Sequence, residues 1–221
     1  PAATMLLVSL VSYVDRNALA LLSPTILKDT RLSAEQYGWI ISCFSVAYML
    51  SNPLWGRWLD RMGVRLGMAA AVLTWSAASA GHALAAGFLG FAAARAALGF
   101  GEGATFPGGL CVVSRTLPPH LRARGVAVAF SGGSLGSVLA PLIITPIALA
   151  WGWRAAFLVT GAFGAGWLML WSVVSRREEI RRKQAPETEQ APATRPRFTD
   201  RRLWAYMLAY ALGALPLSLV I

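Results

Sequence analysis

The amino-acid sequence predicts an all-α transmembrane protein with six membrane-spanning helices, a polar linker and the beginning of a seventh helix. Composition is the first reason, because 56% of the 221 residues are hydrophobic and only 14% are charged, which is too apolar for a soluble domain. Spacing is the second reason. Apolar runs of about 20 residues or more, the length that a helix needs to cross a bilayer, alternate with short polar segments.

The six expected spans follow one another in a regular order. The first is apolar except for an acid–base pair, the third is rich in alanine and serine, and the fourth and fifth are rich in glycine. A polar, proline-dotted stretch over 176–202 has the composition of a linker, and a further apolar span begins at 203 and runs to 221. The expected bounds of the spans are 3–26, 37–58, 66–86, 88–113, 126–150 and 155–174.

The basic residues of the loops predict how the chain is oriented in the membrane. Three Lys or Arg residues lie in the loop after the second span, three in the loop after the fourth and nine in the linker. The opposite side has only Lys28, Arg31 and Arg154. Since cytoplasmic loops carry the excess of basic residues, we expect the N-terminus and the linker on the cytoplasmic side. The net charge of +10 therefore indicates membrane topology rather than a nucleic-acid partner.

Other kinds of site are not indicated by the sequence. Cys43 and Cys111 fall in apolar runs, which predicts neither a disulfide framework nor a metal site. His82 and His120 have no potential ligand partners nearby in the sequence. Since no HExxH motif and no Ser/His or paired-Asp arrangement is present, we expect neither an enzyme nor a bound metal.

Four ionisable side chains are expected at membrane depth, where each costs about 2.5–3.5 kcal/mol on insertion scales. Arg95 and Glu102 are seven residues apart, which is two helical turns, so they share one face of the fourth span. Asp15 and Arg16 are adjacent in the first span and point about 100° apart.

Two interpretations of these charges stay open at this point. They form structural ion pairs between helices, for example Asp15 with Arg95, or they line a water-filled cavity with cationic walls and titratable carboxylates. Arginine suits such a cavity because its planar fork binds a carboxylate through two parallel hydrogen bonds. Tyr48 is a further candidate, since it places a hydroxyl in mid-span, outside the interfacial belts of aromatic residues. It either lines the cavity or packs against another helix.

Glycine and proline in the fourth and fifth spans predict local geometry. The glycines indicate that helices approach one another closely. Pro107 and Pro141 are expected to bend their helices, because proline lacks the N–H that continues the hydrogen-bond ladder.

Several motifs resemble those of one family, the major facilitator superfamily. The segment Gly56-x-x-x-Asp60-Arg61-x-Gly63-x-Arg65, placed between the second and third spans, is similar at every fixed position to the cytoplasmic signature loop of that family. Further motifs resemble the anion:cation symporter branch and, within it, the hexuronate and other sugar-acid transporters. These are Tyr13-x-Asp15-Arg16-Asn17, Arg95-x-x-x-Gly99-x-Gly101, Gly101-Glu102-Gly103 with Phe106-Pro107, and Gly152-Trp153-Arg154 with Phe157.

The resemblance implies a fold and a set of roles. Residues 1–175 would form the six-helix N-terminal bundle of a twelve-helix fold, 176–202 its cytoplasmic linker and 203–221 the first helix of the C-terminal bundle. The implied substrate-binding residues are Arg16, Tyr48 and Arg95, and the implied proton-coupling residues are Asp15 and Glu102. A gating role, by docking onto the C-terminal bundle, is implied for Gly56, Asp60, Arg61, Gly63 and Arg65.

The implied function is proton-coupled symport of an organic anion, a hexuronate or other sugar acid, by alternating access across a bacterial inner membrane. Protons are the coupling ion and no other cofactor is implied. The expected partners are the small anion, the lipid bilayer and the C-terminal bundle. Two departures bear on the substrate: Gly132-Gly133-Ser134 stands where relatives often have Asn or Gln, and Thr105 where sugar-acid relatives often have Asn. The alternative is a uniporter or exporter of another organic acid or of a drug on the same fold.

Overall fold

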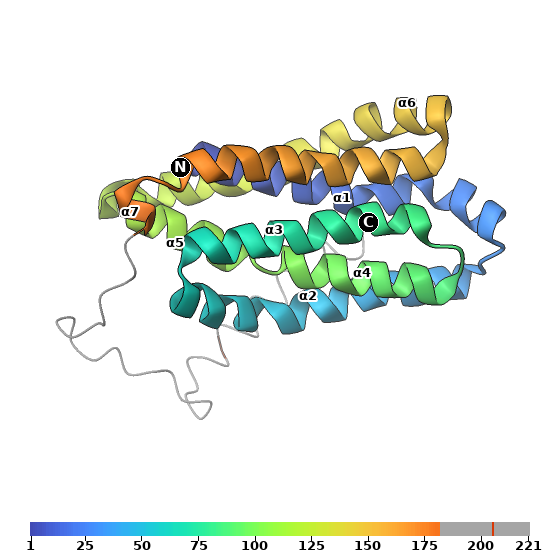
Figure 1. Cartoon of the computed structure of the whole chain (residues 1–221), viewed down its shortest axis with the longest axis horizontal. Coiled ribbons are helices and arrows are strands. Elements are labelled where there is room, and N and C mark those ends of the chain that lie inside the picture. Colours follow the sequence, from blue (N-terminus) through green and yellow to red (C-terminus); the bar gives the residue numbers. More distant parts are fainter. Residues whose placement is uncertain (182–204, 206–221) are drawn as a thin grey trace. The chain divides into compact units, whose positions relative to one another are not determined.

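The computed structural model describes residues 1–181 and Ala205, and every regular element in this part of the chain is helical. The long helices lie side by side along one axis, and the chain passes back and forth between the two ends (Figure 1). Their bounds are α1 Ala2–Thr30, α2 Ala34–Met62, α3 Val64–Gly81, the 3-10 turn η1 His82–Leu84, α4 Phe88–Glu102, α5 Thr105–Thr116, α6 Pro119–Val174 and α7 Glu178–Arg181. The predicted linker and seventh helix fall, apart from residues 176–181 and Ala205, outside the described residues.

The first, second, fifth and sixth predicted spans lie within α1, α2 and α6. The third was predicted to reach residue 86, but α3 ends at Gly81 and η1 at Leu84. By length and hydropathy, three described stretches could each cross a membrane: Ala2–Thr30, Phe88–Thr116 and Pro119–Val174. The last has 56 residues, enough for the fifth and sixth predicted spans together. The helices α2 and α3 are not in that set.

The predicted fourth span is not one continuous helix. It is divided into α4 and α5 at Gly103 and Ala104. Because Pro107 has no N–H, the carbonyl of Gly103 cannot receive the i+4 hydrogen bond that would continue the ladder. The amide of Ala104 instead donates to the carbonyl of Gly101 at 3.2 Å, a tighter turn. The expected effect of Pro107 is therefore a break, and it places Glu102 at the last residue of α4.

The turn between the fifth and sixth spans consists of a single residue. Gly152 has φ 82° and ψ 164°, values that glycine adopts without strain, and there the chain reverses direction within α6 (Figure 1). Between α2 and α3, Gly63 also has a positive φ, 84°. The signature segment was expected to form a loop, but α2 continues to Met62, so its residues Gly56 to Arg61 lie on the last turns of a helix.

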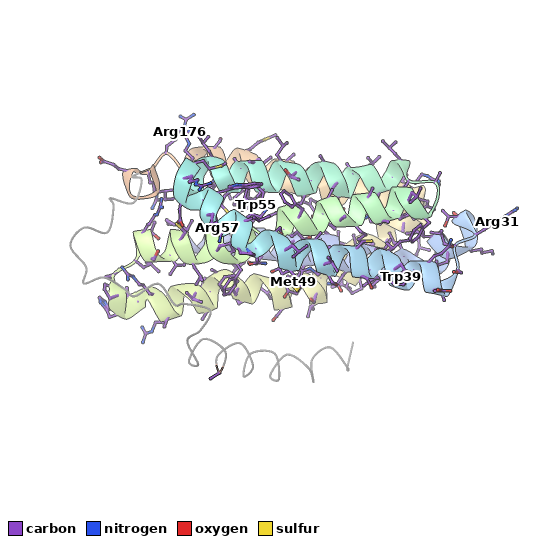
Figure 2. All side chains as sticks on the ribbon, turned by 90° about the horizontal axis from the view of Figure 1, so that it is seen from below. Arg31, Trp39, Met49, Trp55, Arg57 and Arg176 are labelled. Atoms are coloured by element: carbon purple, nitrogen blue, oxygen red, sulfur yellow. The ribbon has the colours of Figure 1, made fainter. Side chains whose placement is uncertain are left out.

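Described basic residues from the two predicted sides lie at different ends of the bundle. Arg31 is at one end, and Arg176 is at the other, with Arg57 toward that second end (Figure 2). The alternation of the helices thus separates Arg31 from Arg57 and Arg176.

Tryptophan side chains join helices that are distant in the sequence. The indole N–H of Trp167 donates to the carbonyl of Thr4 at 2.8 Å, and that of Trp171 donates to the carbonyl of Arg65 at 2.9 Å. Both rings are buried, so they fill the core and satisfy their own polar atoms.

Glycine lets α1 and α6 approach closely. A Cβ on Gly132 would collide with the backbone carbonyl of Leu6, so only glycine permits this spacing. We expect Gly132→Ala to separate the helices and to lower the free energy of unfolding by about 1–3 kcal/mol, as overpacking does. Thermal unfolding of the full-length protein in detergent measures the loss. The control is Gly166→Ala, also on α6, where a Cβ would meet nothing within 4 Å; equal stability of both variants would contradict this packing.

Candidate functional site

The centre of the candidate site is an ion pair between α1 and α4. The Arg16 guanidinium donates to Glu102 Oε2 from Nη2 at 2.7 Å and from Nε at 3.1 Å. Ser12, one turn before Arg16 on α1, donates its hydroxyl to the same oxygen at 2.9 Å. Glu102 has no exposed side-chain surface, whereas Arg16 keeps 29% of its own. The cation of the pair is therefore the accessible partner.

Three aromatic rings surround the Arg16 guanidinium. Its central carbon lies 4.8 Å from the ring centroid of Tyr13, 4.9 Å from that of Phe44 and 4.9 Å from that of Tyr48. A cation over such a ring gains about 0.5–2 kcal/mol, depending on its exposure to water. Phe44 reaches the site because Gly99 of α4 has no side chain, and a Cβ there would collide with the backbone carbonyl of Phe44. The rings hold the guanidinium in place without neutralising it.

Arg95 lies beside this group and is buried, with 1% of its surface exposed. Its Nη2 donates to the backbone carbonyl of Arg16 across a long 3.4 Å, and its guanidinium carbon is 5.8 Å from the centroid of Phe44. Its Nε has no hydrogen-bond partner, and neither has Glu102 Oε1. Since buried polar atoms are normally paired, these two atoms are among the exceptions in the described part of the chain.

Asp15 points away from Arg16, as the 100° step between adjacent helical residues predicts. The hydroxyl of Ser79, on α3, lies 2.7 Å from Asp15 Oδ1 and 2.8 Å from the hydroxyl of Thr160, on α6. All three side chains are buried. Asp15 and Arg95 do not form the ion pair that the structural interpretation suggested. An ion pair joins Arg16 to Glu102 instead.

The structure thus brings together four of the five predicted substrate and proton residues. Arg16, Tyr48 and Glu102 are in mutual contact through Arg16, and Arg95 adjoins them, whereas Asp15 belongs to a separate polar cluster. Four further residues support them and were not among the predicted site residues: Ser12, Phe44, Ser79 and Thr160. A usable signal existed for Ser12 and Phe44, since each lies four residues before a predicted site residue and so on the same helical face.

The signature residues lie apart from these charges. Asp60 and Arg61 are exposed on the last turns of α2, and Gly63 supplies the positive φ that separates α2 from α3. The backbone carbonyl of Arg65 accepts the hydrogen bond from Trp171, which holds this segment against the second half of α6. The two exposed charges are accessible to another part of the protein.

Comparison with known proteins gives a family and several relatives. A family model described as the Major Facilitator Superfamily matches residues 5–221. A galacturonate transporter of Dickeya chrysanthemi is 33% identical over 182 residues, which are 82% of this chain and 53% of that protein. A hexuronate transporter of Bacillus subtilis is 35% identical over 183 residues, 82% of this chain and 43% of that protein. The chain thus spans about half the length of these curated relatives.

A solved structure has the same helical arrangement. The crystal structure of a bacterial homolog to the human lysosomal transporter Spinster, in an inward-facing and occupied conformation, matches with a TM-score of 0.73 at 21% identity. The match covers 83% of this chain and 45% of that one. At this identity the likeness concerns the fold alone.

The ion pair makes a prediction about stability. Arg16→Ala leaves a buried carboxylate without its cation, which we expect to lower the free energy of unfolding by up to about 3–5 kcal/mol. Adding Glu102→Gln should restore most of that loss, because both remaining side chains are then neutral. Thermal unfolding of the single and double variants gives the coupling energy.

Arg57→Ala, which removes an exposed arginine, is the control and should change stability little. Additive losses in the double variant would mean that Arg16 and Glu102 do not depend on each other.

Proposed function

Because the chain belongs to the Major Facilitator Superfamily, we propose that the protein is a secondary active transporter that carries a sugar acid, such as a hexuronate, together with protons. The family match confirms the resemblance predicted from the signature segment, and it places the chain in a family of transporters rather than of enzymes. The apolar helices and this family make the chain part of an integral membrane protein. The relatives named for galacturonate and hexuronate transport support the choice of substrate.

The observation that carries the proposal is the exposed fraction of Arg16 beside a buried acid. A guanidinium at membrane depth keeps 29% of its surface accessible while its partner, Glu102, keeps none. A substrate carboxylate offers the same two oxygens as Glu102 and is able to accept the same N–H groups. Substrate and Glu102 therefore compete for one cation.

Protonation of Glu102 decides that competition. A neutral Glu102 no longer attracts Arg16, so the guanidinium is free to bind the carboxylate of the substrate. The unpartnered Nε of Arg95 supplies a second donor nearby. When Glu102 loses its proton on the other side of the membrane, it takes Arg16 back and the anion leaves. Binding of substrate and of proton are thereby coupled through one pair of side chains.

The stoichiometry sets the driving force. One proton per monoanion moves no net charge, whereas a second proton adds about 2.3 kcal/mol for each 100 mV of membrane potential. Asp15 is the candidate for a second proton site.

Movement follows the alternating-access scheme, in which two bundles rock about a site at mid-membrane. The exposed Asp60 and Arg61 of the signature segment are positioned to dock onto the C-terminal bundle and so to hold one of the two states. By the positive-inside rule we expect the N-terminus and residues 176–202 on the cytoplasmic side, in a bacterial inner membrane.

We expect Glu102→Gln to uncouple transport from protons and to leave substrate binding intact. The amide cannot ionise, so Arg16 stays free of a charged partner and exchange of substrate down its gradient continues. The measurement compares counterflow of labelled galacturonate with uptake driven by an inward proton gradient, in proteoliposomes of the full-length protein.

The control for this prediction is Glu35→Gln, an exposed glutamate in the first turn of α2, which should transport as the unsubstituted protein does. Accumulation by Glu102→Gln under a pH gradient would show that Glu102 is not the proton site. Uptake by the unsubstituted protein that ignores a protonophore would favour the uniporter or exporter instead.

Substrate class is tested by thermal stabilisation. Hexuronates and aldonates are expected to raise the unfolding temperature of the full-length protein, because a ligand at a hundredfold excess over its Kd adds about 2.7 kcal/mol. The neutral parent sugars should have no effect, and Arg16→Ala should abolish the stabilisation. Stabilisation by aromatic acids but not by sugar acids would contradict the proposed substrate.

A further inference from the structure

We propose that Ser79 and Thr160 are positioning residues for a protonated Asp15, with which they form a chain of hydrogen bonds that the neutral acid completes. The carboxylate form leaves this chain one proton short. The inference rests on the proposed proton coupling and separates the roles of its two acids. In this conformation Asp15 holds a proton, while Glu102 is paired with Arg16.

The geometry is a linear series of oxygen atoms that joins α1, α3 and α6. Asp15 Oδ1 is 2.7 Å from Ser79 Oγ, and Ser79 Oγ is 2.8 Å from Thr160 Oγ1. The series ends at the backbone carbonyl oxygen of Phe157, 3.1 Å from Thr160 Oγ1. Asp15, Ser79 and Thr160 each have at most 1% of their surface exposed, so the protons for these contacts come from the series itself.

A count of protons distinguishes the two forms of Asp15. If Asp15 is ionised, the two hydroxyl protons of Ser79 and Thr160 must serve three contacts, and one contact has no hydrogen. If Asp15 is protonated on Oδ1, it donates to Ser79, Ser79 donates to Thr160, and Thr160 donates to the Phe157 carbonyl. Each contact then has one proton, and only this arrangement satisfies all of them.

The surroundings of Glu102 differ in kind. One oxygen of Glu102 accepts three hydrogen bonds, two of them from the Arg16 guanidinium. Asp15 has a single hydroxyl on one oxygen, and its Oδ2 has no hydrogen-bond partner. Glu102 is surrounded by donors, which suits a carboxylate. Asp15 instead stands at the end of a series of hydroxyls that are able to accept a hydrogen bond from a protonated acid.

The charges that act on Asp15 come from α4. From α4, Arg95 and Glu102 act on it with opposite signs. Its neighbour Arg16 on α1 is turned to Glu102, and the buried His82 of η1 lies within the electrostatic reach of Arg95. The residue that α3 presents to Asp15 is the neutral Ser79, and α6 adds the neutral Thr160. Arg95 and Glu102 on α4 thus have opposite effects on Asp15. The hydroxyl series is the contact that is specific to Asp15.

Two substitutions are expected to move the protonation of Asp15 in opposite directions. Thr160→Val removes the hydroxyl that accepts the hydrogen bond from Ser79 when Asp15 is protonated. An ionised Asp15 keeps its hydrogen bond from Ser79 in this variant. Protonation of Asp15 should therefore require a lower pH. Ser79→Ala removes the hydroxyl that donates to the carboxylate, a charge-assisted and stronger bond than the one that the neutral acid loses. Protonation should then persist to a higher pH.

The readout is the infrared carbonyl band of protonated Asp15 in the full-length protein, reconstituted in lipid and titrated with pH. Asp15→Asn assigns the band by removing it. We expect the midpoint to change by about threefold to tenfold in proton concentration, the range given by one net hydrogen bond. The pH midpoint of proton-driven uptake, measured on the same variants, should move in the same directions.

Thr160→Ser keeps the hydroxyl and is the matched control, with a midpoint like that of the unsubstituted protein. If Ser79→Ala does not fold, the difference between Thr160→Val and Thr160→Ser decides the question alone. Midpoints that do not move, or that move together in one direction, overturn the inference, as does the lack of any Asp15 band. Because the infrared titration does not depend on transport, a failure of proton-driven uptake with shifted midpoints would overturn the proposed function and leave the protonated Asp15 series standing.

Discussion

The structure depends on one constraint, that a carboxylate fully buried among apolar helices must be provided with donors and a cation. Glu102 receives both from α1, through Arg16 and Ser12. This requirement fixes how α1 and α4 face each other, because a rotation of either helix would leave a buried charge unpaired, which is strongly destabilising. The rings of Tyr13, Phe44 and Tyr48 then position the cation from α1 and α2. Three helices are therefore oriented by one ion pair.

Glycine makes that orientation possible. Gly99 brings α2 so near to α4 that Phe44 reaches both arginines, and Gly132 brings α6 onto α1. In a membrane the association of helices gains little from the hydrophobic effect, so close backbone contact and polar pairs carry the specificity. Tryptophan acts in the same sense, since the buried indoles of Trp167 and Trp171 tie the second half of α6 to α1 and to the start of α3. Polar contacts thus set the arrangement, and glycine permits it.

The two membrane acids show how the same chemical group acquires different properties. Glu102 meets a guanidinium, and Asp15 meets hydroxyls, although both lie in the interior of one bundle. Under the proposed function, Glu102 shares Arg16 with the substrate anion, so its surroundings change when substrate binds. An acid held by hydroxyls responds to the proton without competing for that cation. This division would let a transporter sense the two cargoes at separate but neighbouring places.

The sequence by itself determined the class of the protein, the order of its six spans, the membrane charges and the family, because hydropathy, loop charge and the signature segment are properties of local sequence. It also predicted that Arg95 and Glu102 share a helical face, and both side chains are buried in α4. Only the tertiary structure decided the partners. Arg16 and Glu102 are 86 residues apart, and Ser79 and Thr160 are 81 apart. Which side chains meet over such separations is set by the rotation and spacing of packed helices. The break at Gly103 also became visible only in the structure, because a proline in a span predicts a distortion but not whether the helix bends or divides.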